Sequence, residues 1–195
     1  MSVLRRVGAR AAALLAVASA GPALGADAAA GAQKAQVCVA CHGTAGVSAN
    51  PTAPSLAGQP AQFVATQLLM FREGNRKDPQ MSPFAANLSN ADINDLAEYF
   101  AAQKLTLPAA GVSTDAETGA RLARQLNCVQ CHGPTLMGQQ HIPRLAGQQR
   151  EYLKTQLRGF KAQTRFDMDG QMTSAAQPLS DTDIDALANY LAGLR

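Results

Sequence analysis

Two short motifs of cysteine and histidine carry the chemistry that this sequence can do. They occupy residues 38–42 and 128–132, and both read Cys-x-x-Cys-His. Two thiols three positions apart lie on one helical turn, so each can add to a vinyl group of the same porphyrin. The adjacent histidine can then bind the iron. The spacing therefore predicts covalent attachment of c-type haem at both places.

The two motifs use every cysteine of the chain, which has four. A lone Cys-x-x-Cys can also be a redox dithiol or half of a zinc site. Here histidine follows each pair at once and no βαβ pattern surrounds it, which favours two haem c groups over either alternative. The predicted attachment residues are Cys38, Cys41, His42, Cys128, Cys131 and His132.

Residues 1–26 have the order of a secretory signal peptide, which is a basic start, an apolar run and a small-residue cleavage site. These parts are Arg5, Arg6 and Arg10, then residues 11–20, then Ala23, Gly25 and Ala26. The apolar run is shorter than the ~20 residues that a spanning helix needs. We therefore expect cleavage near Ala26 rather than a membrane anchor.

The charge of the chain gives no support for nucleic-acid binding. Of the 17 basic residues, three lie in the leader, so the other 14 balance the 14 acidic residues. Between Arg144 and Arg165, six basic residues oppose only Glu151. We interpret this run as the solvated side of a helix. A docking face for an acidic redox partner is the alternative.

The rest of the chain repeats at offsets of 89 to 91 residues. Pro54-Ser-Leu-Ala-Gly58 recurs as Pro143-Arg-Leu-Ala-Gly147, and the apolar pattern before Tyr99 recurs before Tyr190. Two copies, each with its own haem motif, predict two tandem domains. We place them at residues 27–105 and 114–195, with a linker at 106–113 that contains proline and glycine.

Each half has helical rather than strand periodicity, so the predicted fold is all-α. Helices are expected over residues 28–37, from Pro60 to Gly74 and after the cap-like Ser89, and in the second half from a Thr114 capping box, over 149–160 and after Ser180. At about 80 residues, each half is a marginal size for an apolar core alone. A buried porphyrin would supply the missing apolar mass.

Methionine is the candidate for the second axial ligand of each iron. Met81 and Met172 both lie eighteen residues before the matched tyrosines, in segments expected to be loops. A loop position does not suit the alternative, a methionine that fills a gap in the core. Met168 is the second choice in the latter half, and His141 has no counterpart in the first half.

Pro54 and Pro143 are candidates for supporting the two histidines. A ligating imidazole normally donates its other N–H to an acceptor, and the carbonyl of a proline in a rigid turn can accept it. A simple turn proline is an equal alternative from the residues alone.

Taken together, these motifs resemble class I cytochromes c, and specifically the di-haem cytochrome c4 family. The resemblance covers almost all of the chain after the leader and implies two class I cytochrome c domains, each wrapped around one covalently attached haem. It implies His/Met ligation, with Pro54 and Pro143 accepting from His42 and His132. It also implies terminal helices that cross in each domain and haem propionates near the domain interface. The Thr-Ser that follows Met172, where Ser-Pro follows Met81, departs from the repeat.

The resemblance also implies a function in electron transfer without catalysis. It indicates a monomeric carrier in the periplasm, soluble or loosely associated with a membrane. Such a carrier takes electrons from a quinol-oxidising complex and gives them to a terminal oxidase or reductase. One alternative is the cytochrome subunit of a flavin-containing dehydrogenase of the sulfide-oxidising type. A di-haem peroxidase would need one open axial position, and a gas sensor would need an output domain.

Overall fold

The computed structural model describes residues 25–106 and 116–195. The expected signal peptide lies almost wholly outside the described residues, as do nearly all of the expected linker and the Thr114 cap. The described residues are helical and form no strand, although an isolated bridge joins Gln139 and Ile142. The all-α prediction is therefore confirmed.

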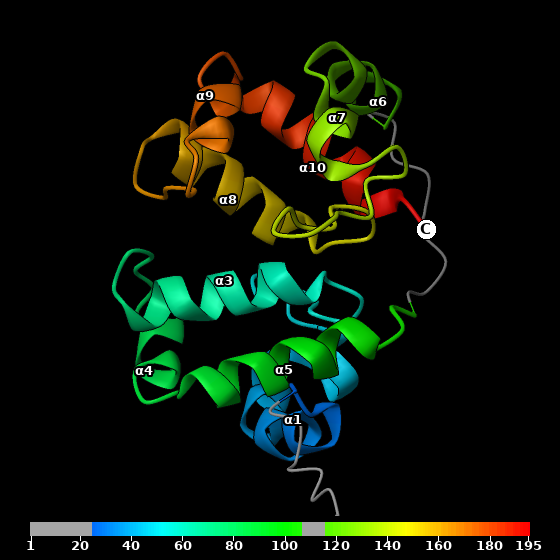
Figure 1. The fold of residues 1–195 in the computed structure, drawn as a ribbon. Coiled ribbons are helices and arrows are strands. Elements are labelled where there is room, and N and C mark those ends of the chain that lie inside the picture. Colours follow the sequence, from blue (N-terminus) through cyan, green and yellow to red (C-terminus); the bar gives the residue numbers. More distant parts are fainter. Residues whose placement is uncertain (1–24, 107–115) are drawn as a thin grey trace, which may run out of the picture.

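The two halves lie one above the other, with α3 and α8 facing each other across the boundary (Figure 1). The first half contains α1 (Ala28–Lys34), the 3-10 helix η1 (Ala35–Cys38), α2 (Val39–His42), the 3-10 helix η2 (Thr44–Gly46), α3 (Ala61–Arg72), α4 (Met81–Ala85) and α5 (Asn90–Ala102). The second half contains α6 (Ala116–Gln125), α7 (Cys128–His132), α8 (Arg150–Lys161), α9 (Gln171–Ala176) and α10 (Asp181–Gly193).

The last helix of each half begins at a capping box, as the sequence predicts. The hydroxyl of Ser89 accepts from the Asp92 backbone N–H at 3.1 Å, and the Asp92 carboxylate accepts from the Ser89 N–H at 2.9 Å. Ser180 and Asp183 make the same pair at the start of α10. These bonds satisfy backbone donors that the first turn of a helix leaves free.

The first and last helices of each half cross where a glycine allows close approach. A Cβ on Gly31 of α1 would lie 2.1 Å from the Asp95 carbonyl oxygen of α5. A Cβ on Gly119 of α6 would lie 2.2 Å from the Ala186 carbonyl oxygen of α10. Cys38 at the end of η1 and Cys128 at the start of α7 pack against the clusters that contain Leu96 and Leu187.

We expect Gly119→Ala to destabilise the second half by about 1–3 kcal/mol, the usual cost of forcing extra atoms into a packed contact. The added methyl would push α6 away from α10. Gly193→Ala is the matched control, because nothing lies within 4 Å of that Cβ and α10 should tolerate it. Denaturant unfolding of the two holoprotein variants measures the difference. Equal midpoints for both would contradict the close crossing.

Candidate haem sites

Both haem motifs lie on short helices with the histidine turned inward. His42 is 5% exposed and His132 is 4% exposed, while Cys41 and Cys131 are exposed and Cys38 and Cys128 are half-buried. The backbone turns sharply after each histidine at Gly43 and Gly133, where φ is 76° and 82°. A Cβ on Gly43 would lie 1.9 Å from the Val47 carbonyl oxygen. Only glycine therefore suits the position directly after the first motif.

A proline carbonyl holds each histidine ring. His42 Nδ1 lies 2.8 Å from the Pro54 carbonyl oxygen, and His132 Nδ1 lies 2.8 Å from the Pro143 carbonyl oxygen. Burial lowers the pKa of both histidines below the ordinary value, although the proline carbonyls act to raise it. A neutral ring that donates from Nδ1 keeps its Nε2 lone pair for a metal.

A cavity of about 630 Å³ lies beside His42. It is lined by both cysteines of the first motif and by apolar side chains that include Phe63, Val64, Leu68, Phe71 and Phe100. The volume is that of a pocket for a small organic cofactor, about 300–1,000 Å³. Two thiols, an imidazole and apolar walls fit a covalently attached porphyrin.

Met81 lines the same cavity as His42. It is the first residue of α4, and the Asp78 carboxylate accepts from its backbone N–H at 2.8 Å. In the second half, the Asp167 carboxylate accepts from the Met172 N–H at 2.8 Å and also from Thr173. Burial alone would raise the pKa of Asp167, but these hydrogen bonds bring it below its usual value.

The expectation that both methionines lie in loops is wrong, because each lies in the first turn of a short helix. The aspartate that precedes each methionine accepts from backbone N–H groups of that first turn. The sequence repeat could have indicated this ordered first turn, because Asp78 and Asp167 match at the offset of 89. Two additional residues then separate Asp167 from Met172, which accounts for the slip in offset to 91.

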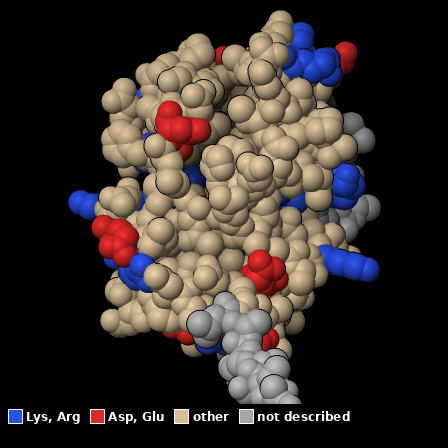
Figure 2. Space-filling model, in the orientation of Figure 1, with Lys and Arg blue, Asp and Glu red and all other residues tan. Residues whose placement is uncertain are grey.

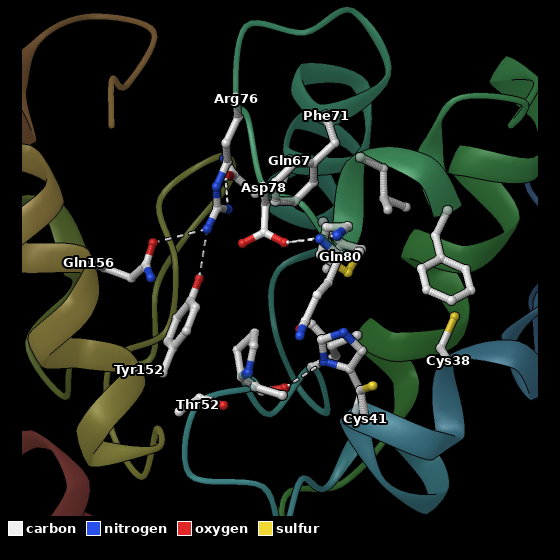
Figure 3. Close-up of a pocket in the computed structure, with 18 of the residues that line it drawn as sticks. Cys38, Cys41, Thr52, Gln67, Phe71, Arg76, Asp78, Gln80, Tyr152 and Gln156 are labelled. Atoms are coloured by element: carbon white, nitrogen blue, oxygen red, sulfur yellow. Dashed lines mark hydrogen bonds between the residues drawn. The ribbon is translucent and has the colours of Figure 1, made fainter. Parts of the chain in front are cut away.

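A polar cluster closes the side of the first cavity that faces the second half. Arg76 donates to Gln67 at 2.6 Å, to Gln156 at 3.0 Å and to Tyr152 at 3.2 Å. Arg165 donates to the same two glutamines from the other half. Figure 3 shows Cys38 and Cys41 on one side of the pocket and Arg76, Tyr152 and Gln156 on the opposite side.

The two arginines of this cluster occupy matched positions and have matched surroundings. The Arg76 guanidinium lies 4.5 Å from the centroid of Phe71, and that of Arg165 lies 4.4 Å from the centroid of Phe160. Burial, together with the nearby Arg76 charge, lowers the pKa of Arg165 to about 10. Within 25–106 and 116–195, neither arginine forms an ion pair with a carboxylate.

Most of the positive charges of the basic run in the second half are buried or paired with carboxylates. Arg144 is 1% exposed between the halves. On α8, three of the four cations pair with Glu151 or with carboxylates of α10, and the fourth, Lys161, donates to the backbone carbonyls of Gln177 and Leu179. Lys154, for example, lies 2.9 Å from Asp185. Figure 2 shows few charged side chains on the visible face, with both signs scattered over it. The interpretation of the run at residues 144–165 as the solvated side of a helix therefore holds for its part in α8, but not for Arg144 or Arg165.

Comparison with known proteins agrees with this arrangement. The family model described as "Cytochrome c" matches residues 116–195, and the one described as "Cytochrome C oxidase, cbb3-type, subunit III" matches residues 25–100. Cytochrome c4 of Pseudomonas aeruginosa is 38% identical over 179 residues, which cover 86% of this chain and 89% of the relative. The chain belongs to the cytochrome c4 family.

Two further similarities refine this assignment. The structure of reduced recombinant cytochrome c4 from Pseudomonas stutzeri matches with a TM-score of 0.82 at 34% identity, over 87% of this chain and 100% of that one. A protein of Thiomonas intermedia (strain K12) named thiosulfate dehydrogenase electron acceptor is 36% identical over 168 residues, which are 80% of this chain and 77% of that relative.

Membership of the cytochrome c4 family settles the cofactor and the general role. The protein carries two covalently bound haem c groups and transfers electrons without being an enzyme. The prediction of two cytochrome c domains is confirmed. Among the described residues, no helix is long and apolar enough to cross a membrane.

Replacing both cysteines of the second motif, Cys128→Ala with Cys131→Ala, should halve the covalently bound haem. Intact-mass measurement should then find one haem where the parent protein carries two. Gln130→Ala is the control, because that side chain lies between the thiols and forms no thioether. An unchanged count of two, or a count of none, would contradict independent attachment at the two motifs.

Proposed function

We propose that each iron is held between an imidazole and a thioether, by His42 with Met81 and by His132 with Met172. The observation that carries this proposal is the presence of His42, both cysteines and Met81 on the wall of one cavity. The second half supports the same arrangement, because Met172 and Cys128 both pack against the cluster that includes Leu187. Met168 is 74% exposed, which disfavours it as the ligand.

The haem supplies reversible one-electron chemistry, and the protein residues hold its ligands in place. Pro54 and Pro143 fix the ring planes, while Asp78 and Asp167 fix the backbone at the methionines. Filled axial positions allow a change of oxidation state without ligand exchange, and a thioether favours the ferrous state. Rigid ligands therefore suit fast single-electron transfer.

Arg76 and Arg165 are suited to bind the carboxylates of the haems. Arg76 lies across the first cavity from the cysteines (Figure 3), and Arg165 lines the same cavity and donates to the same two glutamines. A porphyrin attached through its vinyl edge directs its propionates to the opposite edge. Guanidinium groups without carboxylate partners in the described chain fit such anions. This placement would bring the propionates to the boundary between the halves.

In the cell, we propose a periplasmic carrier that accepts electrons from a quinol-oxidising complex and passes them to a terminal oxidase or reductase. The leader of residues 1–26 supports export, and the family supports the role of carrier. We propose domain bounds of 27–105 and 114–195 with a linker at 106–113, and the family matches to residues 25–100 and 116–195 support two such units. We propose that the protein is a monomer, because the boundary surface of each half is already covered by the other half of the same chain.

A second candidate is an electron acceptor for a dehydrogenase. Its support is the similarity to the protein named thiosulfate dehydrogenase electron acceptor, which is close to that shown by the cytochrome c4 relatives. The alternative raised from the sequence, a cytochrome subunit of a flavin-containing sulfide-oxidising dehydrogenase, is also an electron acceptor for a dehydrogenase.

The two roles predict different donors for the oxidised protein. A quinol-oxidising complex supplied with quinol should reduce both haems faster than thiosulfate dehydrogenase supplied with thiosulfate. Stopped-flow absorbance of the haem bands measures both rates at equal enzyme concentration. The reverse order would favour the second candidate, and rapid peroxide turnover by the protein alone would contradict both.

Met172→Ala should abolish the thioether-to-iron absorption band of the second haem and leave that of the first. Visible spectroscopy of the oxidised holoprotein should therefore show about half of the parental band, since ligand identity sets the band. Met168→Ala is the matched control and should leave the band intact. A loss caused by the Met168 change, with none from the Met172 change, would reverse the assignment.

A further inference from the structure

The peptide bond that supports each histidine is also bonded by a glutamine from the other half of the molecule. The Pro54–Ser55 peptide accepts from His42 through its carbonyl oxygen at 2.8 Å. The N–H of the same peptide, on Ser55, donates to Gln148 Oε1 at 2.7 Å. Gln148 lies 93 residues away in the second half, and its side chain touches the support of the first histidine.

The second half repeats this arrangement in reverse. The Pro143–Arg144 peptide accepts from His132 at 2.8 Å, and its N–H donates to Gln59 Oε1 at 2.9 Å. Gln59 belongs to the first half. Gln59 and Gln148 match at the offset of 89, as do Ser55 and Arg144. The two contacts are therefore related by the internal repeat.

Each glutamine is held in one orientation by a second hydrogen bond. Gln148 Nε2 donates to the Ser55 carbonyl oxygen at 2.9 Å, and Gln59 Nε2 donates to the Arg144 carbonyl oxygen at 3.0 Å. A backbone N–H can meet only the oxygen of the amide, and a carbonyl can meet only its nitrogen. All four residues are at most 3% exposed, so water does not compete for these groups.

A hydrogen bond at one end of a peptide group strengthens the bond at its other end. Donation from the N–H shifts electron density toward the carbonyl oxygen, and such chains reinforce one another in a buried, weakly polar environment. A stronger acceptor draws the Nδ1 proton further from the imidazole and makes the ring a more basic ligand. A more basic ligand stabilises ferric iron and lowers the reduction potential.

We propose that Gln148 raises the basicity of His42 and Gln59 that of His132, so that each half of the protein adjusts the reduction potential of the iron in the other half. The inference rests on the proposed ligation by both histidines. It makes the glutamines positioning residues that act through a peptide group. The alternative is that the glutamines only hold the two halves together. In that case their replacement would not change the hydrogen bond or the basicity of one histidine in particular.

Replacement of one glutamine should therefore change the potential of one haem. Gln148→Met keeps the length of the side chain but removes the amide, and it should raise the potential of the first haem alone. Gln59→Met should raise that of the second haem alone. A spectroelectrochemical titration of the holoprotein measures both potentials, and the signals altered in Met172→Ala identify the second haem.

Proton NMR of the reduced protein gives an independent measure. In Gln148→Met the Nδ1–H resonance of His42 should move upfield, as for a weaker hydrogen bond, while that of His132 stays in place. Gln148→Asn, which retracts the amide by one methylene, should shift the same resonance less and serves if the methionine variant folds poorly.

Gln149→Met is the matched control. Gln149 donates across the same boundary to the Ser48 carbonyl, yet its side chain bonds to neither proline peptide. Its replacement should leave both potentials and both Nδ1–H resonances unchanged. Equal shifts of both haems in Gln148→Met, the same shifts in Gln149→Met, or no shift at all would overturn the inference. Failure of the proposed ligation would show separately, as a missing thioether band in the parent protein.

Discussion

The structure depends on holding two buried imidazole rings in one orientation. A ring that is about 5% exposed has little water to bond, so its Nδ1–H must find an acceptor within the protein. The carbonyls of Pro54 and Pro143 are those acceptors. Each motif helix, the glycine turn after it and the crossing of the terminal helices keep a ring against its carbonyl. With Nδ1 engaged, Nε2 is the nitrogen left for iron.

This requirement also explains why the boundary between the halves is polar. The segments after Pro54 and Pro143 have buried backbone groups at the boundary, and buried backbone groups need partners. Gln59 and Gln148 supply them in pairs, one from each half. Farther along α3 and α8, the Arg76 and Arg165 cluster continues the same pattern. The halves are therefore joined by directional bonds, which define one relative placement.

Much of the architecture could be predicted from the sequence, because the signals were local. The Cys-x-x-Cys-His spacing, the caps at Ser89 and Ser180 and the offset of the repeat each follow from short stretches of chain. The contacts between the halves could not be predicted, since no local pattern says which surfaces of two similar domains meet. Gln59 and Gln148 directly follow the Pro-x-Leu-Ala-Gly segments. Only their partners in space show what they bond.

One pair of matched positions has diverged in a way that makes the two halves unequal. Where the first half has Ser55, the second has Arg144, whose guanidinium donates to the carbonyls of Ser55, Ala57 and Ala146. Two copies of the second half, joined in this manner, would bury two like charges together. Two copies of the first would leave the space of a large side chain empty. A symmetric pair of either half is therefore disfavoured, and each half is complementary to the other.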